Sequence, residues 1–62
     1  MEVKFSGGRT IAPEIEWSEI ESYDESTPTS VFDDVALEFS KEFEKTFDHP
    51  EQYEFYYGWE EL

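Results

Sequence analysis

The sequence contains no cysteine, and only four of its 62 residues are lysine or arginine. Without cysteine there are no disulfides and no thiolate metal sites, and a single histidine leaves no histidine-based zinc cage. The shortage of basic residues excludes the positive footprint that nucleic acid and anionic membrane surfaces require. No apolar run approaches a membrane span, and the N-terminus lacks the apolar segment of a signal peptide. We therefore expect a cytoplasmic protein that uses no metal or cofactor and contacts neither nucleic acid nor a membrane directly.

Acidic and aromatic residues are abundant instead. Seventeen aspartates and glutamates give a formal net charge of -13, while aromatic residues make up 19% of the chain. Each aromatic side chain buries about 150–250 Å², so a few of them suffice to build a core. We therefore expect one folded domain, spanning residues 1–62, with an aromatic core, as a monomer or a weak homodimer.

Alternating polar and apolar residues predict two strands near the start of the chain, at Met1–Phe5 and Thr10–Trp17. The pair Gly7-Gly8 between them is typical of a hairpin turn. The apolar residues of the two strands share a face only if the loop has three residues, Ser6–Gly8.

Apolar residues at helical spacing predict a helix over about Val31–Phe47. Its start matches a capping-box variant, Ser30–Asp33. The segment Tyr53–Trp59 alternates again and predicts a third strand, whereas Ser18–Thr29 is polar and acidic and is expected to be a loop. The apolar stripe of the helix consists of Phe32, Val35, Ala36, Phe39, Phe43 and Phe47.

The predicted order of strand, strand, helix and strand defines an α+β fold of ββαβ type. The apolar stripe of the helix needs an apolar sheet face to cover. A crossover that passes over the first strand then gives a three-stranded antiparallel sheet in the order 2-1-3, covered on one face by the single helix.

Catalysis is not expected from this fold. A sheet with one covering helix has little room for a pocket of several hundred Å³, and His49 is the only residue that titrates near neutral pH without special help. The carboxylate pairs Asp24-Glu25 and Asp33-Asp34 lack the loop pattern of a calcium site. The chain is therefore expected to be a binding protein and not an enzyme.

The distribution of the acids indicates what it binds. No basic residue lies between Arg9 and Lys41, and an unopposed charge of this size costs stability through self-repulsion. Carboxylates two apart on a strand or four apart on a helix lie about 6–7 Å from each other, so rows of them can imitate the phosphates of DNA. Leu37 and Tyr56 add apolar anchors among these charges. The expected partner-binding residues are Glu14, Glu16, Glu19, Glu21, Asp24, Glu25, Asp34, Leu37, Glu38, Glu54 and Tyr56.

In size and composition the chain resembles the small acidic DNA-mimic inhibitors encoded by phages. The segment Tyr23–Thr27 is similar to a stretch of the uracil-DNA glycosylase inhibitor, and Glu21-Ser22 resembles the acidic-serine pair that such inhibitors place against the enzyme. The resemblance implies an inhibitor that acts in the host cytoplasm on a basic nucleic-acid-binding protein. Such targets include restriction enzymes, CRISPR effectors, DNA-repair proteins and nucleoid proteins. No site residue is transferred from these short matches.

Two other roles fit the same composition. An antitoxin or immunity protein that neutralises a basic nuclease uses an acidic surface against a dedicated toxin partner. An acidic adaptor binds a partner protein without blocking nucleic acid. A neighbouring gene for a basic toxin would favour the antitoxin, and an early phage operon would favour the DNA mimic.

Overall fold

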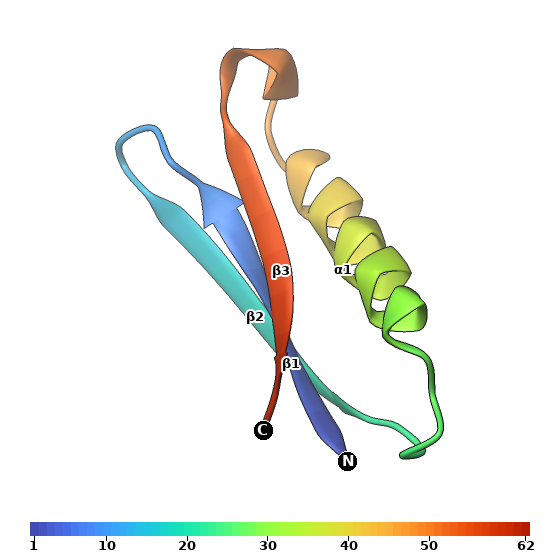
Figure 1. Cartoon of the computed structure of the whole chain (residues 1–62). Coiled ribbons are helices and arrows are strands. Elements are labelled where there is room, and N and C mark those ends of the chain that lie inside the picture. Colours follow the sequence, from blue (N-terminus) through green and yellow to red (C-terminus); the bar gives the residue numbers. More distant parts are fainter.

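The computed structural model describes all 62 residues and contains three strands, one α-helix and one short 3₁₀ helix (Figure 1). The elements in chain order are β1 (Glu2–Arg9), β2 (Ile15–Ser22), α1 (Thr29–Glu44), η1 (Pro50–Gln52) and β3 (Phe55–Glu61). Central β1 pairs antiparallel with both β2 and β3, so the sheet order is β2-β1-β3. The predicted α+β fold of ββαβ type and its sheet order are confirmed. Neither helix has the length and hydropathy that a membrane-spanning helix requires.

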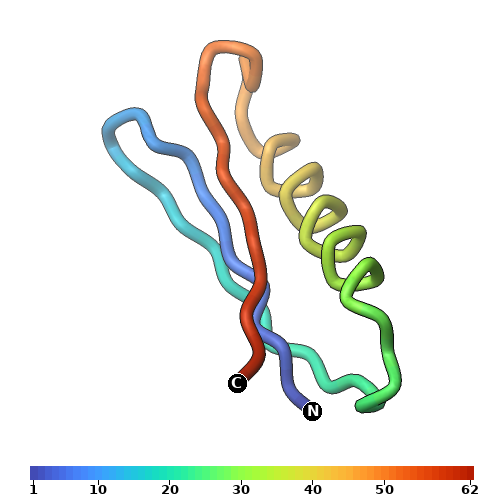
Figure 2. Tube along the Cα trace, viewed as in Figure 1, coloured from blue at the N-terminus to red at the C-terminus, as the bar shows by residue number.

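The molecule has two layers, because α1 covers one face of the sheet and the other face is bare. The helix packs against β3 and β1, whereas β2 lies on the far side of β1 (Figures 1 and 2). Figure 2 also shows both chain termini at the end of the sheet opposite the β1–β2 loop. The Cα trace measures 38 × 17 × 13 Å, so the molecule is elongated along its strands.

The register of β1 decides which residues face the helix. Directly opposed residues in an antiparallel pair lie on the same face, and Phe5 lies opposite Glu19 of β2 and Trp59 of β3. Phe5 is fully buried and packs against the rings of Phe32 and Phe39 in α1. The odd-numbered residues of β1 therefore face the helix, and the even-numbered residues lie on the bare outer face.

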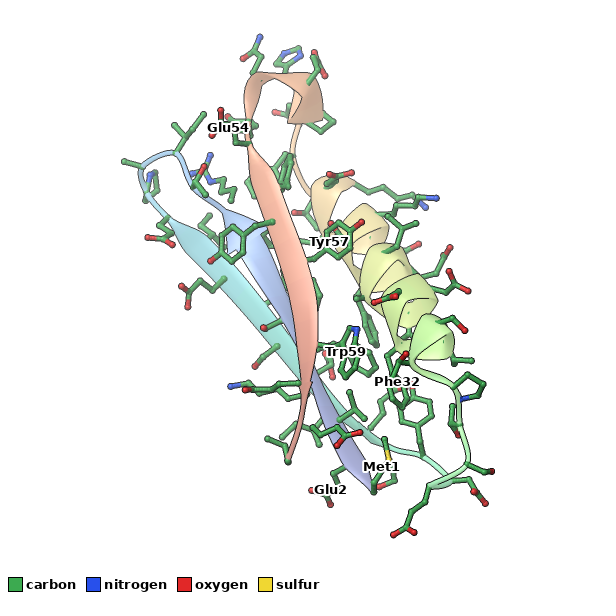
Figure 3. All side chains as sticks on the ribbon, in the orientation of Figure 1. Met1, Glu2, Phe32, Glu54, Tyr57 and Trp59 are labelled. Atoms are coloured by element: carbon green, nitrogen blue, oxygen red, sulfur yellow. The ribbon has the colours of Figure 1, made fainter.

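The core is small and mostly aromatic. Around Phe32, the rings of Tyr23 and Trp59 pack edge-on with centres 4.9 Å and 5.0 Å away, and Figure 3 shows Phe32 and Trp59 between β3 and α1. The Trp59 Nε1–H donates a hydrogen bond of 2.7 Å to Asp33 Oδ1, which ties β3 to the helix. The four core residues, each at most 1% exposed, are Val3, Phe5, Phe32 and Ala36.

A second aromatic cluster lies at the end of the sheet nearest the β1–β2 loop. The Phe47 ring packs against those of Phe43, Tyr53 and Phe55 at 5.2–5.5 Å between centres. The guanidinium carbon of Arg9 lies 5.0 Å from the centre of Phe47 and 4.6 Å from that of Tyr53. Arg9 is only 6% exposed and forms no salt bridge, so it is held by attraction between its cation and the two rings.

The predicted turn at Gly7-Gly8 is wrong, because β1 runs through both glycines and the hairpin loop covers residues 10–14. Both glycines leave room for the backbone and for aromatic side chains of the neighbouring strands, since a Cβ would clash with the carbonyl oxygen of Tyr56 at Gly7 and of Ile15 at Gly8. A Cβ on Gly7 would lie 2.7 Å from the Trp17 ring, and one on Gly8 would lie 3.0 Å from the Tyr56 hydroxyl oxygen. Aromatic side chains that cover glycines on a neighbouring strand help to set strand register. In this protein the glycine pair lies within β1, under aromatic side chains, and not in the turn that the pair predicts.

The second strand is later than predicted. The predicted range is Thr10–Trp17, and β2 covers Ile15–Ser22. The strand therefore includes the start of the predicted loop Ser18–Thr29. The register places Glu19 and Glu21 on the face of the sheet that the helix covers elsewhere, and the alternation rule expects apolar residues there. Because α1 does not extend over β2, both glutamates are exposed to water. The predicted loop therefore begins as a strand with acids on both faces.

The predicted helix range is Val31–Phe47. The observed helix begins two residues before Val31 and ends three residues before Phe47. The predicted capping box Ser30–Asp33 does not form, since the N-cap is Pro28 and has no side-chain cap. Proline suits a helix start because the amide hydrogen it lacks would be unpaired there. Phe47 lies beyond the helix, in the second aromatic cluster. The third strand is two residues later than the predicted Tyr53–Trp59.

Candidate interaction surface along β2

An unbroken series of carboxylates follows β2 from the loop before it to the loop after it. None of these side chains forms a salt bridge, and all are exposed. Within β2 only Trp17 is partly buried, because its indole reaches the rings of Phe39 and Phe43 in α1. We call this surface the acidic ridge and define it as Glu14, Glu16, Glu19, Glu21, Asp24 and Glu25.

The ridge lies on both faces of the sheet. Glu16 is opposite Gly8 and therefore belongs to the outer face, whereas Glu19 is opposite Phe5 on the helix-covered face. Glu19 and Glu21 are two residues apart on one strand, which separates them by about 6.8 Å. The two sets of carboxylates meet only at the edge of β2, so a partner that contacts both must lie along that edge.

At the end of the ridge nearest the β1–β2 loop, Tyr56 contacts two of the carboxylates. Its hydroxyl lies 3.2 Å from Glu16 Oε1 and 3.4 Å from Glu14 Oε1 and can donate to either. Burial and the negative charges of Glu16 and Glu14 raise the pKa of Tyr56, so the phenol remains protonated. Glu54 lies just before β3 (Figure 3), and its side chain accepts a hydrogen bond of 3.4 Å from the Thr10 hydroxyl. Four of the predicted site residues therefore lie together.

At the other end of the ridge, hydrogen bonds hold Glu21 and Asp24 in place. The Tyr23 hydroxyl donates to Glu21 Oε2 at 2.8 Å, and burial together with Glu21 raises the pKa of Tyr23 to about 12. Asp24 Oδ1 accepts from the backbone N–H of Ser26 at 2.8 Å and from its hydroxyl at 2.7 Å, which lowers the pKa of Asp24. The hydrogen bonds therefore orient both carboxylates, and the lowered pKa keeps Asp24 ionised near neutral pH.

The predicted site residues on the helix lie apart from the ridge. Asp34 and Glu38 are exposed on α1, and the next carboxylate of their row, Glu42, forms a 3.1 Å salt bridge with Lys45. Leu37 is half-buried and lies outside the core cluster, so it is a less exposed anchor than predicted. The helix row is therefore partly neutralised, in contrast to the ridge.

The bare outer face contains one open groove of about 410 Å³, so the expectation that the fold has little room for a pocket of several hundred Å³ is wrong. Its lining includes the small side chains of Ser6 and Ser18, and no helix covers it. Lys4 is the one cation in its lining. No group of three or more histidine, cysteine, aspartate or glutamate side chains is placed to hold a metal ion. The lining consists of Lys4, Ser6, Gly7, Glu16, Trp17, Ser18 and Tyr56.

Two features of the surface are absent from the sequence prediction. One is the contact of Tyr56 with the carboxylates of Glu14 and Glu16, which joins residues about 40 positions apart and depends on the pairing of β2 and β3 with the same central strand, β1. The other is the open edge of β2 at Ser18 and Ile20. The residues Ile15, Trp17 and Ile20 favour a strand and were the available signal for it.

Comparisons of the chain with protein-family models, with curated proteins and with solved structures find no match. The interpretation of the ridge therefore rests on its own geometry and charge.

Proposed function

We propose that the protein is an acidic DNA mimic that binds a basic nucleic-acid-binding protein and occupies its nucleic-acid groove. The observation that carries this proposal is the exposure of its charge. Of the 17 acidic side chains, 16 are exposed and one, Glu44, is half-buried. Glu42 is the one carboxylate that forms a salt bridge with a lysine or arginine.

The cations of the protein do little to neutralise this surface. Arg9 is buried between Phe47 and Tyr53, and Lys45 is engaged with Glu42. Ordinary protein surfaces intersperse charges of both signs. Here the net charge of -13 is presented almost undiluted, so the field attracts a basic partner over a distance of about a Debye length.

The dimensions of the molecule suit the groove of a DNA-binding protein. Its Cα trace is 38 Å long, and one turn of DNA measures about 34–36 Å. The net charge corresponds to about one negative charge per 3 Å of length, and one strand of DNA carries about one phosphate per 3.4 Å. The linear charge density of the protein is therefore close to that of one DNA strand.

The mechanism is competitive. Carboxylates take the positions of phosphates against the Lys and Arg side chains of the target, and the electrostatic attraction accelerates association. Tyr56 adds an aromatic anchor that an array of charges lacks, since aromatic side chains dominate binding hot spots. Binding is therefore expected to weaken steeply as salt is added.

A gel-shift competition tests the proposal. Affinity capture from a lysate of the source cells at low salt first identifies the basic target, and labelled DNA or RNA is then titrated against the protein on that target. We expect either ligand to displace the other. A ternary complex of protein, target and nucleic acid would contradict mimicry and favour an adaptor.

Matched charge-reversal variants locate the surface in the same assay. Reversal of Glu14 and Glu16 to lysine is expected to slow association with the target by about tenfold or more, because steering depends on charge near the interface. The same reversal at Glu60 and Glu61 changes the net charge equally at the end of β3, and we expect a smaller effect there. Equal effects would assign the binding to net charge alone.

A further inference from the structure

The outer edge of β2 presents unpaired backbone groups in a regular series. The N–H of Tyr23 donates to the carbonyl oxygen of Met1 at 2.8 Å, so in this register the odd-numbered residues of β2 bond to β1. The N–H and C=O groups of the even-numbered residues therefore point away from the sheet. These residues are Glu16, Ser18, Ile20 and Ser22.

This edge is open along its whole length. It belongs to a strand of eight residues without proline, and α1 lies over β1 and β3 instead (Figure 1). A strand edge of this kind is a template for pairing with another chain. Its acids make it a selective template, because a side chain on an added strand lies about 4.5–5.5 Å from the one directly opposite.

We propose that the edge of β2 binds an extended segment of its basic partner by antiparallel strand addition, with lysine or arginine of that segment beside Glu19 and Glu21. This rests on the proposed function for the charge of the partner and adds the way in which the two chains dock. Antiparallel pairing is favoured because its hydrogen bonds are more stable per residue than those of parallel pairing.

Charge argues against a second copy of this chain as the occupant. Two β2 strands paired at their edges would bring Glu16, Glu19 and Glu21 of one copy beside the same residues of the other, and β2 contains no basic residue. Like charges placed opposite each other on neighbouring strands are destabilising. The same carboxylates would stabilise a strand that carries cations at alternate positions.

The test uses synthetic eight-residue peptides, as long as β2, in which lysine alternates with threonine. In antiparallel addition, lysines opposite Glu19 and Glu21 turn their N–H groups away from β2, and the threonine N–H groups form the new hydrogen bonds. N-methylation of the threonine amides should weaken binding by about tenfold or more relative to N-methylation of the lysine amides. Both peptides carry the same charge, so an electrostatic attraction alone does not separate them.

Titration calorimetry of the two peptides at low salt decides the matter. Three outcomes would overturn antiparallel strand addition. The two peptides could bind with equal affinity, neither could bind, or the lysine-methylated peptide could be the one with the lower affinity. These outcomes leave the proposed function standing, because only a ternary complex in the gel shift contradicts it. The failure of one proposal is thus distinct from that of the other.

A matched pair of variants tests the edge from the side of the protein. Glu16→Pro removes an N–H that points to the open edge of β2, and Glu61→Pro removes the corresponding N–H on the outer edge of β3. Both remove one carboxylate, and proline is tolerated where its missing N–H faces solvent. With folding verified by circular dichroism, we expect the peptide affinity to fall about tenfold for Glu16→Pro and less than twofold for Glu61→Pro. Equal losses would overturn the proposal.

Discussion

The two outer strands of the sheet have opposite characters. β3 lies beneath α1, and its Trp59 packs on Phe32 and bonds to Asp33. β2 lies outside the helix, and seven of its eight residues are exposed. One strand contributes to the core, and the other contributes charge to the surface, although both pair with the same central strand.

This difference shows how a very acidic chain of 62 residues can remain folded. Self-repulsion among the acids opposes folding, so the charges are least costly where they do not displace packing. The apolar area of the molecule is concentrated between α1, β1 and β3, where aromatic rings pack edge-on. β2 needs only Trp17 to attach to that core, which leaves its edge free for a partner.

The largest effect is expected from removing an aromatic ring of the helix-covered part. Phe32 is fully buried and contacts the rings of Phe5, Tyr23 and Trp59. Phe32→Ala should lower the free energy of unfolding by about 3–5 kcal/mol, because it loses buried area and leaves a cavity. Urea unfolding measures this loss.

The matched change on β2 is Ile20→Ala, at a side chain that is 56% exposed. We expect a loss of less than about 0.5 kcal/mol there. If the two substitutions destabilised the protein equally, β2 would be part of the core and the contrast between the strands would be wrong.

The second effect concerns the glycines beneath the aromatic rings. A Cβ on Gly7 would clash with the backbone carbonyl oxygen of Tyr56 and lie 2.7 Å from the Trp17 ring, so Gly7→Ala should destabilise by about 1–3 kcal/mol through overpacking. Gly58 in β3 has no atom within 4 Å of such a Cβ, and Gly58→Ala should stabilise by about 0.4–1 kcal/mol because it restricts the unfolded chain. Thermal unfolding distinguishes the two signs, and a stabilising Gly7→Ala would contradict the close packing of Tyr56 and Trp17 around Gly7.

A smaller effect is expected at alkaline pH, where the β2–α1 junction should weaken. The pKa of Tyr23 is raised from 10.0 to about 12 by burial and by Glu21. Between these values the folded state keeps the proton that the unfolded state has lost, so stability present below pH 10 declines as the pH rises towards 12. Tyr56, whose pKa is raised by burial and two glutamates, acts in the same direction.

Tyr23→Phe removes the phenol and should flatten this part of the stability profile, measured by denaturant unfolding at a series of pH values. Tyr57→Phe, on the exposed part of β3, serves as the control and should leave the slope as it is. An unchanged slope in Tyr23→Phe would show that the hydroxyl does not couple the β2 end to folding.

The smallest effect is that of salt. Carboxylates without cationic partners repel each other, and screening at about 0.5 M NaCl reduces that repulsion. The unfolding free energy should rise by about 1 kcal/mol or less, seen as an increase in Tm of at most about 4–8 °C. A Tm that falls with salt would indicate that attractive pairs such as Lys45–Glu42 dominate the surface instead.

Periodicity within single segments was enough to predict the fold. The alternation around Phe5 and the helical spacing from Phe32 to Phe43 identify core-facing positions, and the structure places Phe5 and Phe32 in the core. The order of the elements then leaves few topologies, and the sheet order follows. These are local properties, because each depends on residues close together in the chain.

The position of the acidic surface depended on tertiary structure. Gly7-Gly8 is a turn signal by itself, whereas in the structure both glycines pair with β2 and β3, whose backbone and aromatic atoms occupy the space of a Cβ. Glu19 has the position of a core residue in its strand, and it is exposed only because α1 stops short of β2. In a strand, side chains alternate between the two faces, so the sequence determines which residues share a face. Whether that face is covered depends on where the helix packs.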